Sequence, residues 1–361
     1  MIQYLFADDW DLDKIKTSLL EYNVESFSDG FVIPWGMTFL PDGSLIVSDI
    51  SGKMYKLSFD GQKKIMISGV PNVFYEGQGG FLDVEVHPEF DNNNLIYISY
   101  SDLVGNTSCT AIVRAKLIED QLINLEIIYK ADEIYYSKSN YHFGSRIVLD
   151  NKYLYFSIGD RGEKEDAQDL NLPNGKIHRL FLNGDVPPDN PFMNNSGEKS
   201  SIWCYGNRNP QGLTFGKNGT LWELEHGPKG GDELNIIIKG NNYGWPIITY
   251  GINYNGTIIS DYTHMDGMEQ PVWHWTPSIA VCGMKIYEGD KFSQWNGNIL
   301  VTSLKFEYLE RVVIENNKRI SSEIIYKPGS RVGDVEVGPN GNIYVALEDP
   351  GRIVKLLPVN N

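Results

Sequence analysis

The chain has 361 residues, of which 41% are hydrophobic and 22% are charged, so it is long enough to bury a large core. A formal net charge of −16 argues against a nucleic-acid or anionic-membrane partner, because both attract clustered Lys and Arg. No apolar run reaches the length that spans a bilayer, so we expect a soluble protein. The 36 Gly and 21 Tyr residues favour turns and sheets over helices.

The N-terminal part of the chain is the least regular. We predict a short helix over residues 11–22 and a strand over residues 24–27. Residues 1–10 lack the basic start and the long apolar core of a signal peptide. Three widely spaced cysteines show no CxxC metal pattern, and we expect them to be buried thiols. They are Cys109, Cys204 and Cys282.

One pattern then recurs six times along the chain. A turn rich in Asn, Asp and Gly leads into an alternating apolar strand, and the strand ends on small and polar residues. The copies are PDGSLIVSD (41–49), NNNLIYISYSD (92–102), DNKYLYFSIGD (150–160), KNGTLWELEHG (217–227), WNGNILVTSLK (295–305) and PNGNIYVALED (339–349).

A long repeat with several short strands per unit is typical of a β-propeller with one copy per blade. The sequence therefore predicts an all-β fold, a single six-bladed β-propeller over residues 1–361. Propeller rings usually close by pairing the two ends of the chain, and we expect the segment around Val24 to do this. Residues 186–199 and 250–271 are too polar for a core and are predicted to be long surface loops.

Because the strand ends repeat, the polar residues beside them are expected to gather on one face around the axis. One His next to a carboxylate suggests a general base held in one tautomer. Several cations in an acidic protein suggest an anionic ligand. Each residue also has a structural alternative, such as a satisfied His142, a solvated Lys305 or Arg331, and an Arg146 that braces a blade. The candidates for the face are Gln78, His142, Asp160, Arg208, Asn209, Gln211, Lys305 and Arg331.

Seven motifs occur in order: GQGG, HFGSR, GNRNPQGL, EHGP, DELN, NYGWP and TSLK. Together they closely resemble the quinoprotein family of soluble glucose and aldose sugar dehydrogenases. The resemblance runs from about Ile33 to Leu357, and the short loops are more similar to the aldose sugar dehydrogenase branch. The family fold is a six-bladed propeller, which agrees with the repeat count.

The resemblance implies a bound pyrroloquinoline quinone (PQQ) and Ca²⁺. It makes His142 the general base, Asp160 its orienting carboxylate and Arg208 the group that stabilises the developing oxyanion. The residues implied as cofactor contacts are Gln78, His142, Arg208, Asn209, Gln211, Lys305 and Arg331. The implied metal ligands are the carbonyls of Gly227 and Pro228 for the cofactor calcium, and Glu233 and Tyr243 for a second, structural calcium.

The implied reaction is oxidation of an aldose at C1 to a lactone, with hydride transfer to the quinone. An external acceptor, such as a quinone, a dye or a cytochrome, then takes the electrons. The family also implies a periplasmic or secreted location. Two departures stand out: Gly333 occupies the place of a second cofactor-binding Arg, and Tyr141 occupies the place of an Asp found in glucose dehydrogenase.

Two other functions remain open at this point. One is a non-catalytic propeller that serves as a binding module, since propellers have many functions. The retained His142, Arg208 and Lys305 argue against it. The other is a calcium-dependent lactonase-like hydrolase, which needs acidic and amide side chains around its metal, whereas the expected pocket here is cationic.

Overall fold

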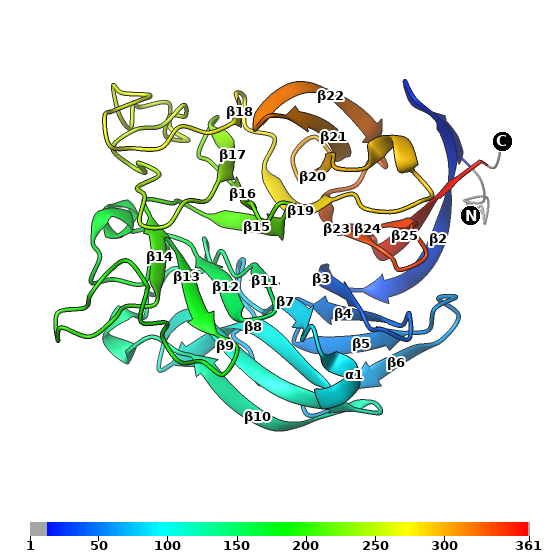
Figure 1. Cartoon of the computed structure of the whole chain (residues 1–361), viewed down its shortest axis with the longest axis horizontal. Coiled ribbons are helices and arrows are strands. Elements are labelled where there is room, and N and C mark those ends of the chain that lie inside the picture. Colours follow the sequence, from blue (N-terminus) through cyan, green and yellow to red (C-terminus); the bar gives the residue numbers. More distant parts are fainter. Residues whose placement is uncertain (1–12, 360–361) are drawn as a thin grey trace, which may run out of the picture.

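The computed structural model describes residues 13–359, and these residues form six β-sheets arranged in a ring (Figure 1). The described helices are short: α1 (Phe90–Asn93) and three single-turn 3-10 helices. The all-β, six-bladed prediction is therefore confirmed. No helix among the described residues is long and apolar enough to cross a membrane.

Each blade is an antiparallel sheet whose strands follow one another in the chain, except in the last blade. Blade one contains β3 (Pro34–Phe39), β4 (Leu45–Asp49), β5 (Lys53–Leu57) and β6 (Lys64–Ile67); blade two contains β7 (Phe81–Val86), β8 (Leu95–Val104), β9 (Thr107–Ile118) and β10 (Gln121–Tyr129); blade three contains β11 (Ile147–Leu149), β12 (Tyr153–Ile158), β13 (Lys176–Phe181) and β14 (Ile202–Tyr205).

The other three blades follow the same plan. Blade four contains β15 (Pro210–Phe215), β16 (Leu221–Glu225), β17 (Asp232–Ile236) and β18 (Trp273–Trp275); blade five contains β19 (Val281–Ile286), β20 (Ile299–Ser303), β21 (Tyr308–Glu315) and β22 (Lys318–Tyr326); blade six contains β23 (Val332–Val337), β24 (Ile343–Leu347), β25 (Gly351–Pro358), β2 (Glu21–Phe31) and β1 (Asp13–Lys16).

The six copies of the sequence repeat form the second strand of each blade, namely β4, β8, β12, β16, β20 and β24. These strands are almost entirely buried, because apolar clusters fill the space on both of their faces between neighbouring blades. The three cysteines are free and buried, as predicted. The segments 186–199 and 250–271 hold no named strand and are largely exposed, so they are surface loops.

The ring closes as expected, since β2 from the N-terminal part pairs with β25 from Tyr22↔Pro358 to Phe31↔Gly351. The predicted helix over residues 11–22 is wrong where it can be compared, because residues 13–16 form β1 and Glu21 begins β2. Residues 11 and 12 lie outside the described part. Pairing along the open edge of the sheet satisfies the backbone of residues 13–16, and the Thr17 side chain closes the turn by donating to Leu20 O at 2.8 Å.

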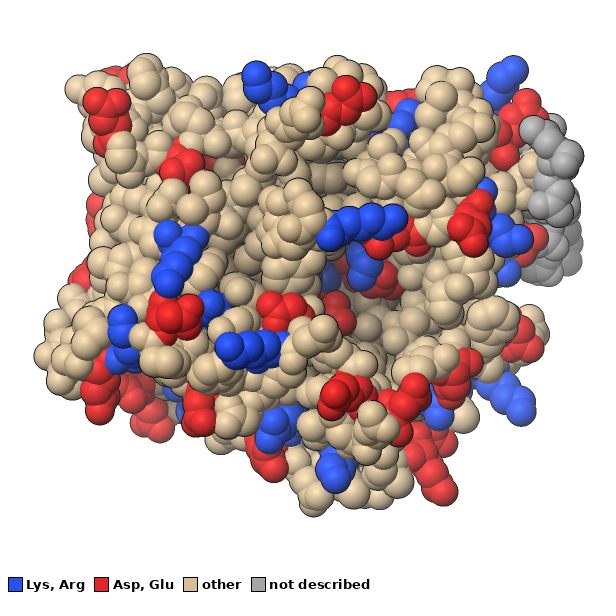
Figure 2. All heavy atoms as spheres, viewed as in Figure 1, with Lys and Arg blue, Asp and Glu red and all other residues tan. Residues whose placement is uncertain are grey.

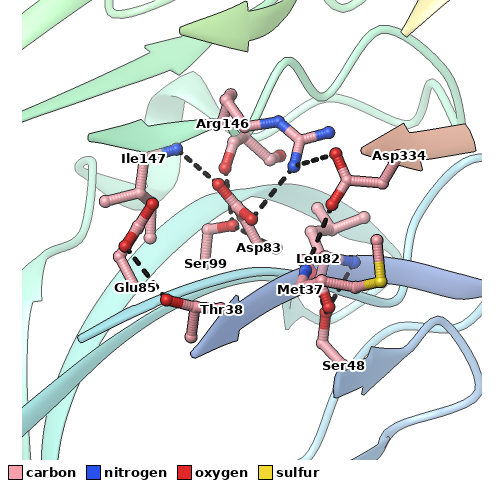
Figure 3. A network of polar contacts seen from close by, with 12 residues as sticks. Met37, Thr38, Ser48, Leu82, Asp83, Glu85, Ser99, Arg146, Ile147 and Asp334 are labelled. Atoms are coloured by element: carbon pink, nitrogen blue, oxygen red, sulfur yellow. Dashed lines mark hydrogen bonds and ion pairs between the residues drawn. The ribbon is translucent and has the colours of Figure 1, made fainter. Parts of the chain in front are cut away.

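The centre of the ring holds a network of buried charge (Figure 3). The Arg146 guanidinium lies 3.1 Å from Asp83 Oδ1 and 3.3 Å from Asp334 Oδ1, so it joins blades two, three and six. Glycines at neighbouring inner strands make room for these side chains: a Cβ on Gly36 would lie 2.6 Å from Asp83 Oδ1, and one on Gly283 would overlap Asp334. Arg146 thus has the structural role considered from the sequence.

The surface shown in Figure 2 carries Lys and Arg side chains interspersed with Asp and Glu, and it is hollowed near its middle. This face shows no extended basic patch.

Candidate active site

A cavity of about 550 Å³ lies among loops of blades two, three and four. Its size falls in the roughly 300–1,000 Å³ range of small-molecule sites. The residues that line it are Gln78, Tyr141, His142, Asp160, Gly162, Lys164, Arg208, Pro228, Trp245, Asn253, Tyr254 and Ile259. Five residues singled out from the sequence therefore meet in one place: Gln78, His142, Asp160, Arg208 and Pro228.

His142 and Asp160 form the closest polar pair in the cavity, with Nδ1 of the His 2.6 Å from Oδ1 of the Asp. Burial lowers the pKa of His142 to about 4, and this outweighs the opposite effect of the Asp160 hydrogen bond. Burial opposes ionisation of Asp160, but the hydrogen bond from His142 and the positive charge of Arg208 lower the pKa of that carboxyl. A neutral His142 that donates from Nδ1 to the carboxylate keeps Nε2 as an acceptor.

Local backbone geometry places His142 at the cavity wall. Its φ of 56° lies in the left-handed region, which is uncommon for residues other than Gly. Its backbone N–H donates to Gln78 Oε1 at 2.7 Å. A Cβ on Gly159 would overlap the carbonyl oxygen of His142, so the two loops approach this closely only because residue 159 is Gly. The HFGSR segment (142–146) and the Gly159–Asp160 segment therefore pack against each other closely.

Arg208 is buried, and its guanidinium donates to the carbonyls of His226 and Gly227 at 2.8 and 2.9 Å. These partners are neutral, and no ion pair of this guanidinium occurs in the described part of the chain. The nearby Glu225 accepts from the Arg208 backbone N–H at 2.6 Å. Burial raises the pKa of Glu225 to about 7. The Arg208 charge is thus available to a ligand in the cavity.

Trp245 is a cavity residue that was not predicted from the sequence. Its indole N–H donates to Asp160 Oδ2 at 2.8 Å across 85 residues of sequence, and Gly162 N donates to Asp160 Oδ1 at 2.8 Å. These bonds fix the carboxylate that orients His142. The NYGWP motif was the available signal, although it carries no spacing that links it to Asp160. Four further lining residues were also missed, because their segments, a short 3-10 helix and the loop over residues 250–271, have no recognisable sequence pattern: Lys164, Asn253, Tyr254 and Ile259.

Several predicted cofactor contacts lie outside the cavity lining. Asn209 is buried, and its Oδ1 accepts from Gly144 N at 3.1 Å. Gln211 is buried toward the axis, where its carbonyl accepts from Arg146 Nε. Lys305 is exposed beside the Phe306 ring. Arg331 is exposed and paired with Glu348 at 2.5 Å, although its charge still contributes to lowering the pKa of His226.

The predicted metal ligands occupy different surroundings. Pro228 lines the cavity, and no described group donates to its carbonyl, whereas the Gly227 carbonyl accepts from Arg208 and lies 2.7 Å from His226 Nδ1. Glu233 lies in blade four, and its pKa is raised to about 8 by burial and by Glu225. Tyr243 is buried, with its hydroxyl donating to Ile236 O at 2.6 Å. Within residues 13–359, no cluster of three His, Cys, Asp or Glu side chains has metal-binding geometry.

Comparison with known proteins places the chain among sugar dehydrogenases. The family model described as glucose / sorbosone dehydrogenase matches residues 31–355. The chain is 37% identical over 349 residues to an aldose sugar dehydrogenase of Escherichia coli (strain K12), covering 94% of this chain and 93% of that protein.

Solved structures agree. The apo-form of the aldose sugar dehydrogenase from Escherichia coli is similar with a TM-score of 0.88 and 35% identity, over 94% of this chain and 100% of that one. The PQQ-bound aldose sugar dehydrogenase from Streptomyces coelicolor is similar with a TM-score of 0.77 and 25% identity, over 93% and 98% of the two chains. The chain therefore belongs to the glucose / sorbosone dehydrogenase family, as its motifs predicted, and is an enzyme of the sugar dehydrogenase class.

Proposed function

We propose that this protein oxidises aldose sugars at C1 to lactones, with PQQ and Ca²⁺ as its cofactors. The observation that carries the proposal is the His142–Asp160 pair in a cavity that also holds the Arg208 cation. The names of its relatives, one of them solved with PQQ bound, support the same class of reaction. Transfer of the electrons to an external acceptor completes the cycle.

His142 is the general base in this proposal. Its low pKa of about 4 keeps the ring neutral near pH 7, and Asp160 fixes Nδ1 as the donor. Nε2, to which no described group donates, then accepts the proton of the C1 hydroxyl. The Arg208 guanidinium stabilises the negative charge that develops on that oxygen. Gln78 holds the backbone of His142 and so keeps the base in position.

The residues present fit the implied cofactors. The Arg208 guanidinium, whose hydrogen-bond partners are neutral carbonyls, suits a carboxylate of PQQ, and the carbonyl of Pro228 suits calcium, which prefers oxygen ligands. When bound, PQQ supplies the two-electron acceptor and Ca²⁺ a Lewis acid beside it. Asn209, Gln211, Lys305, Arg331 and Gly227 remain proposed contacts from outside the lining, and Glu233 with Tyr243 remains the proposed place of a structural calcium.

The test is sugar oxidation with a dye acceptor, measured with and without PQQ and with and without Ca²⁺. Activity that requires both additions is the expected result. Hydrolysis of lactones without PQQ would favour the lactonase-like alternative. Absence of both activities, together with no binding of PQQ in a titration, would favour a non-catalytic binding module and overturn the proposal. A periplasmic or secreted location is part of the proposal and is tested by fractionation of the native cell.

A further inference from the structure

The loop that follows the catalytic carboxylate carries an unusual arrangement of charge. Residues 160–166 read DRGEKED, so one Lys lies within an acidic run. After Gly162, Lys164 is the residue of this segment that lines the cavity. Its neighbours Glu163 and Glu165 are exposed and do not line the cavity. In a protein with a net charge of −16, this places a cation where the surrounding sequence supplies anions.

The nearby carboxylates do not neutralise Lys164. Asp166 accepts a hydrogen bond from the buried Asn174 amide at 2.9 Å. Asp160 is committed to His142, Trp245 and Gly162. Within the described part of the chain, Lys164 has neither an ion pair nor a hydrogen bond from its ammonium group.

The rest of the wall suits a sugar ring. Tyr141 lies edge-on to His142 with the ring centroids 4.8 Å apart, and Tyr254 is mostly exposed with a hydroxyl that has no partner among the described residues. Aromatic side chains of this kind offer an apolar face and a polar tip to a polyhydroxylated ligand. The cavity therefore provides a base for C1, aromatic walls and a second, unpaired cation.

We propose that Lys164 is a specificity-determining residue, which binds an anionic group on the aldose at a distance from C1. The group is a carboxylate, as in a uronic acid, or a phosphate, as in a sugar phosphate; both accept charge-assisted hydrogen bonds from an ammonium group. This inference rests on the proposed function. It assigns the Arg208 charge to the cofactor and the reacting oxygen, and the Lys164 charge to the substrate.

The experiment compares glucose, glucuronate and glucose 6-phosphate in the dye-linked assay of the PQQ- and Ca²⁺-loaded enzyme. For the wild type, we expect a lower KM for at least one anionic sugar than for glucose. Lys164→Gln should raise that KM about 5- to 20-fold, with kcat and the glucose KM within about twofold. Lys164→Glu should raise it further, and Lys164→Arg should preserve the preference. Whichever anionic sugar responds identifies the group.

Lys217→Gln, at an exposed position outside the cavity, is the matched control and should change none of these values. Equal KM values for neutral and anionic sugars that persist in Lys164→Gln would overturn the inference and leave the proposed function intact. The inference also fails if Lys164→Gln weakens PQQ binding in a titration and slows all sugars equally, since Lys164 would then be a cofactor contact. Inactivity of the wild type toward every sugar would overturn the proposed function and this inference together.

Discussion

Two regions of this molecule bring charged side chains together from several blades. They differ in whether the buried Arg side chain has carboxylate partners. On the axis, Arg146 contacts two carboxylates, Asp83 and Asp334, and also donates to Gln211 O at 2.8 Å (Figure 3). In the cavity, the Arg208 guanidinium donates to two neutral carbonyls, lies over the Trp245 ring and forms no ion pair with a described residue. Both Arg side chains are buried, so the difference lies in their partners rather than in solvent access.

The comparison separates structural charge from functional charge. A buried ion pair whose members are all matched holds elements in place, and breaking it leaves an unpaired buried charge. A buried cation without a carboxylate partner is unfavourable by itself and becomes favourable when an anionic ligand or transition state meets it. The two regions should therefore respond differently to substitution: the cavity in activity, and the axis in stability.

The largest effect is expected at the base. His142→Ala should lower kcat by about 10³-fold or more, because no other group in the cavity has a neutral acceptor held by a carboxylate. PQQ binding, measured by titration, should persist, and the melting temperature should stay near that of the wild type. His264→Ala, at an exposed position outside the cavity lining, is the control. Full activity of His142→Ala would remove His142 from the mechanism.

Arg146→Met should have the opposite effect, with a loss of stability and little change in activity. It leaves Asp83 and Asp334 facing each other without their cation, and we expect a loss of about 3–5 kcal/mol in the free energy of unfolding. The activity of the remaining folded enzyme should be close to normal. The control is Lys355→Met, which breaks a pair with Glu25 at 3.5 Å near the surface and should cost less than about 1 kcal/mol. Equal destabilisation by the two substitutions would contradict a special role for the axis.

A smaller effect is expected at the residue that holds the orienting carboxylate. Trp245→Phe removes the hydrogen bond to Asp160 Oδ2 while keeping an aromatic ring at the wall, so kcat should fall about tenfold. Trp273→Phe is a matched control, because the Trp273 indole N–H has no hydrogen-bond partner among residues 13–359. The kcat values of both variants are measured by steady-state kinetics. Similar values would show that the hydrogen bond from Trp245 to Asp160 does not contribute to turnover.

The repeat was readable from the sequence because its signals are local. Turn residues and the alternating strand lie side by side in each copy, so β4 and its five equivalents were predicted in the right places. The strand β1 was not, because it depends on pairing with residues 21–24 at the free edge of a sheet, and short segments adopt the structure that such pairing offers. By contrast, β2 was predicted in part, as a strand over residues 24–27 that closes the ring, and its pairing with β25 confirms this.

The site was predictable where a motif carried it. His142 and Asp160 lie 18 residues apart in two recognisable segments, and they meet as expected. Trp245 lies in a long connection within blade four, and Lys164 begins the short 3-10 helix Lys164–Gln168. Their positions near Asp160 and the cavity depend on the packing of the whole ring and cannot be read from local sequence spacing. The close contact between Gly36 and Asp83 on the axis could not be predicted from the sequence for the same reason, since the two residues belong to different blades.

The smallest effect concerns the pH dependence of stability on the axis. Burial raises the pKa of Glu85 to about 8, against the lowering effect of Lys285, with Glu336 and Asp83 adding to the rise. The folded state then binds a proton at Glu85 more tightly than the unfolded state, so the wild type loses stability as pH rises from about 4.5 to 8.

Glu85→Gln removes this titration. The variant should melt close to the wild type at pH 5, where the native carboxyl is already protonated, and a few degrees above it at pH 9, where the wild type carries a charge that burial disfavours. Calorimetry at the two pH values measures the difference. Glu89→Gln, at an exposed position, should give the same difference from the wild type at both. A constant difference for Glu85→Gln would mean that Lys285 compensates the Glu85 charge fully, and the axis would then contain no proton-binding carboxylate at this position.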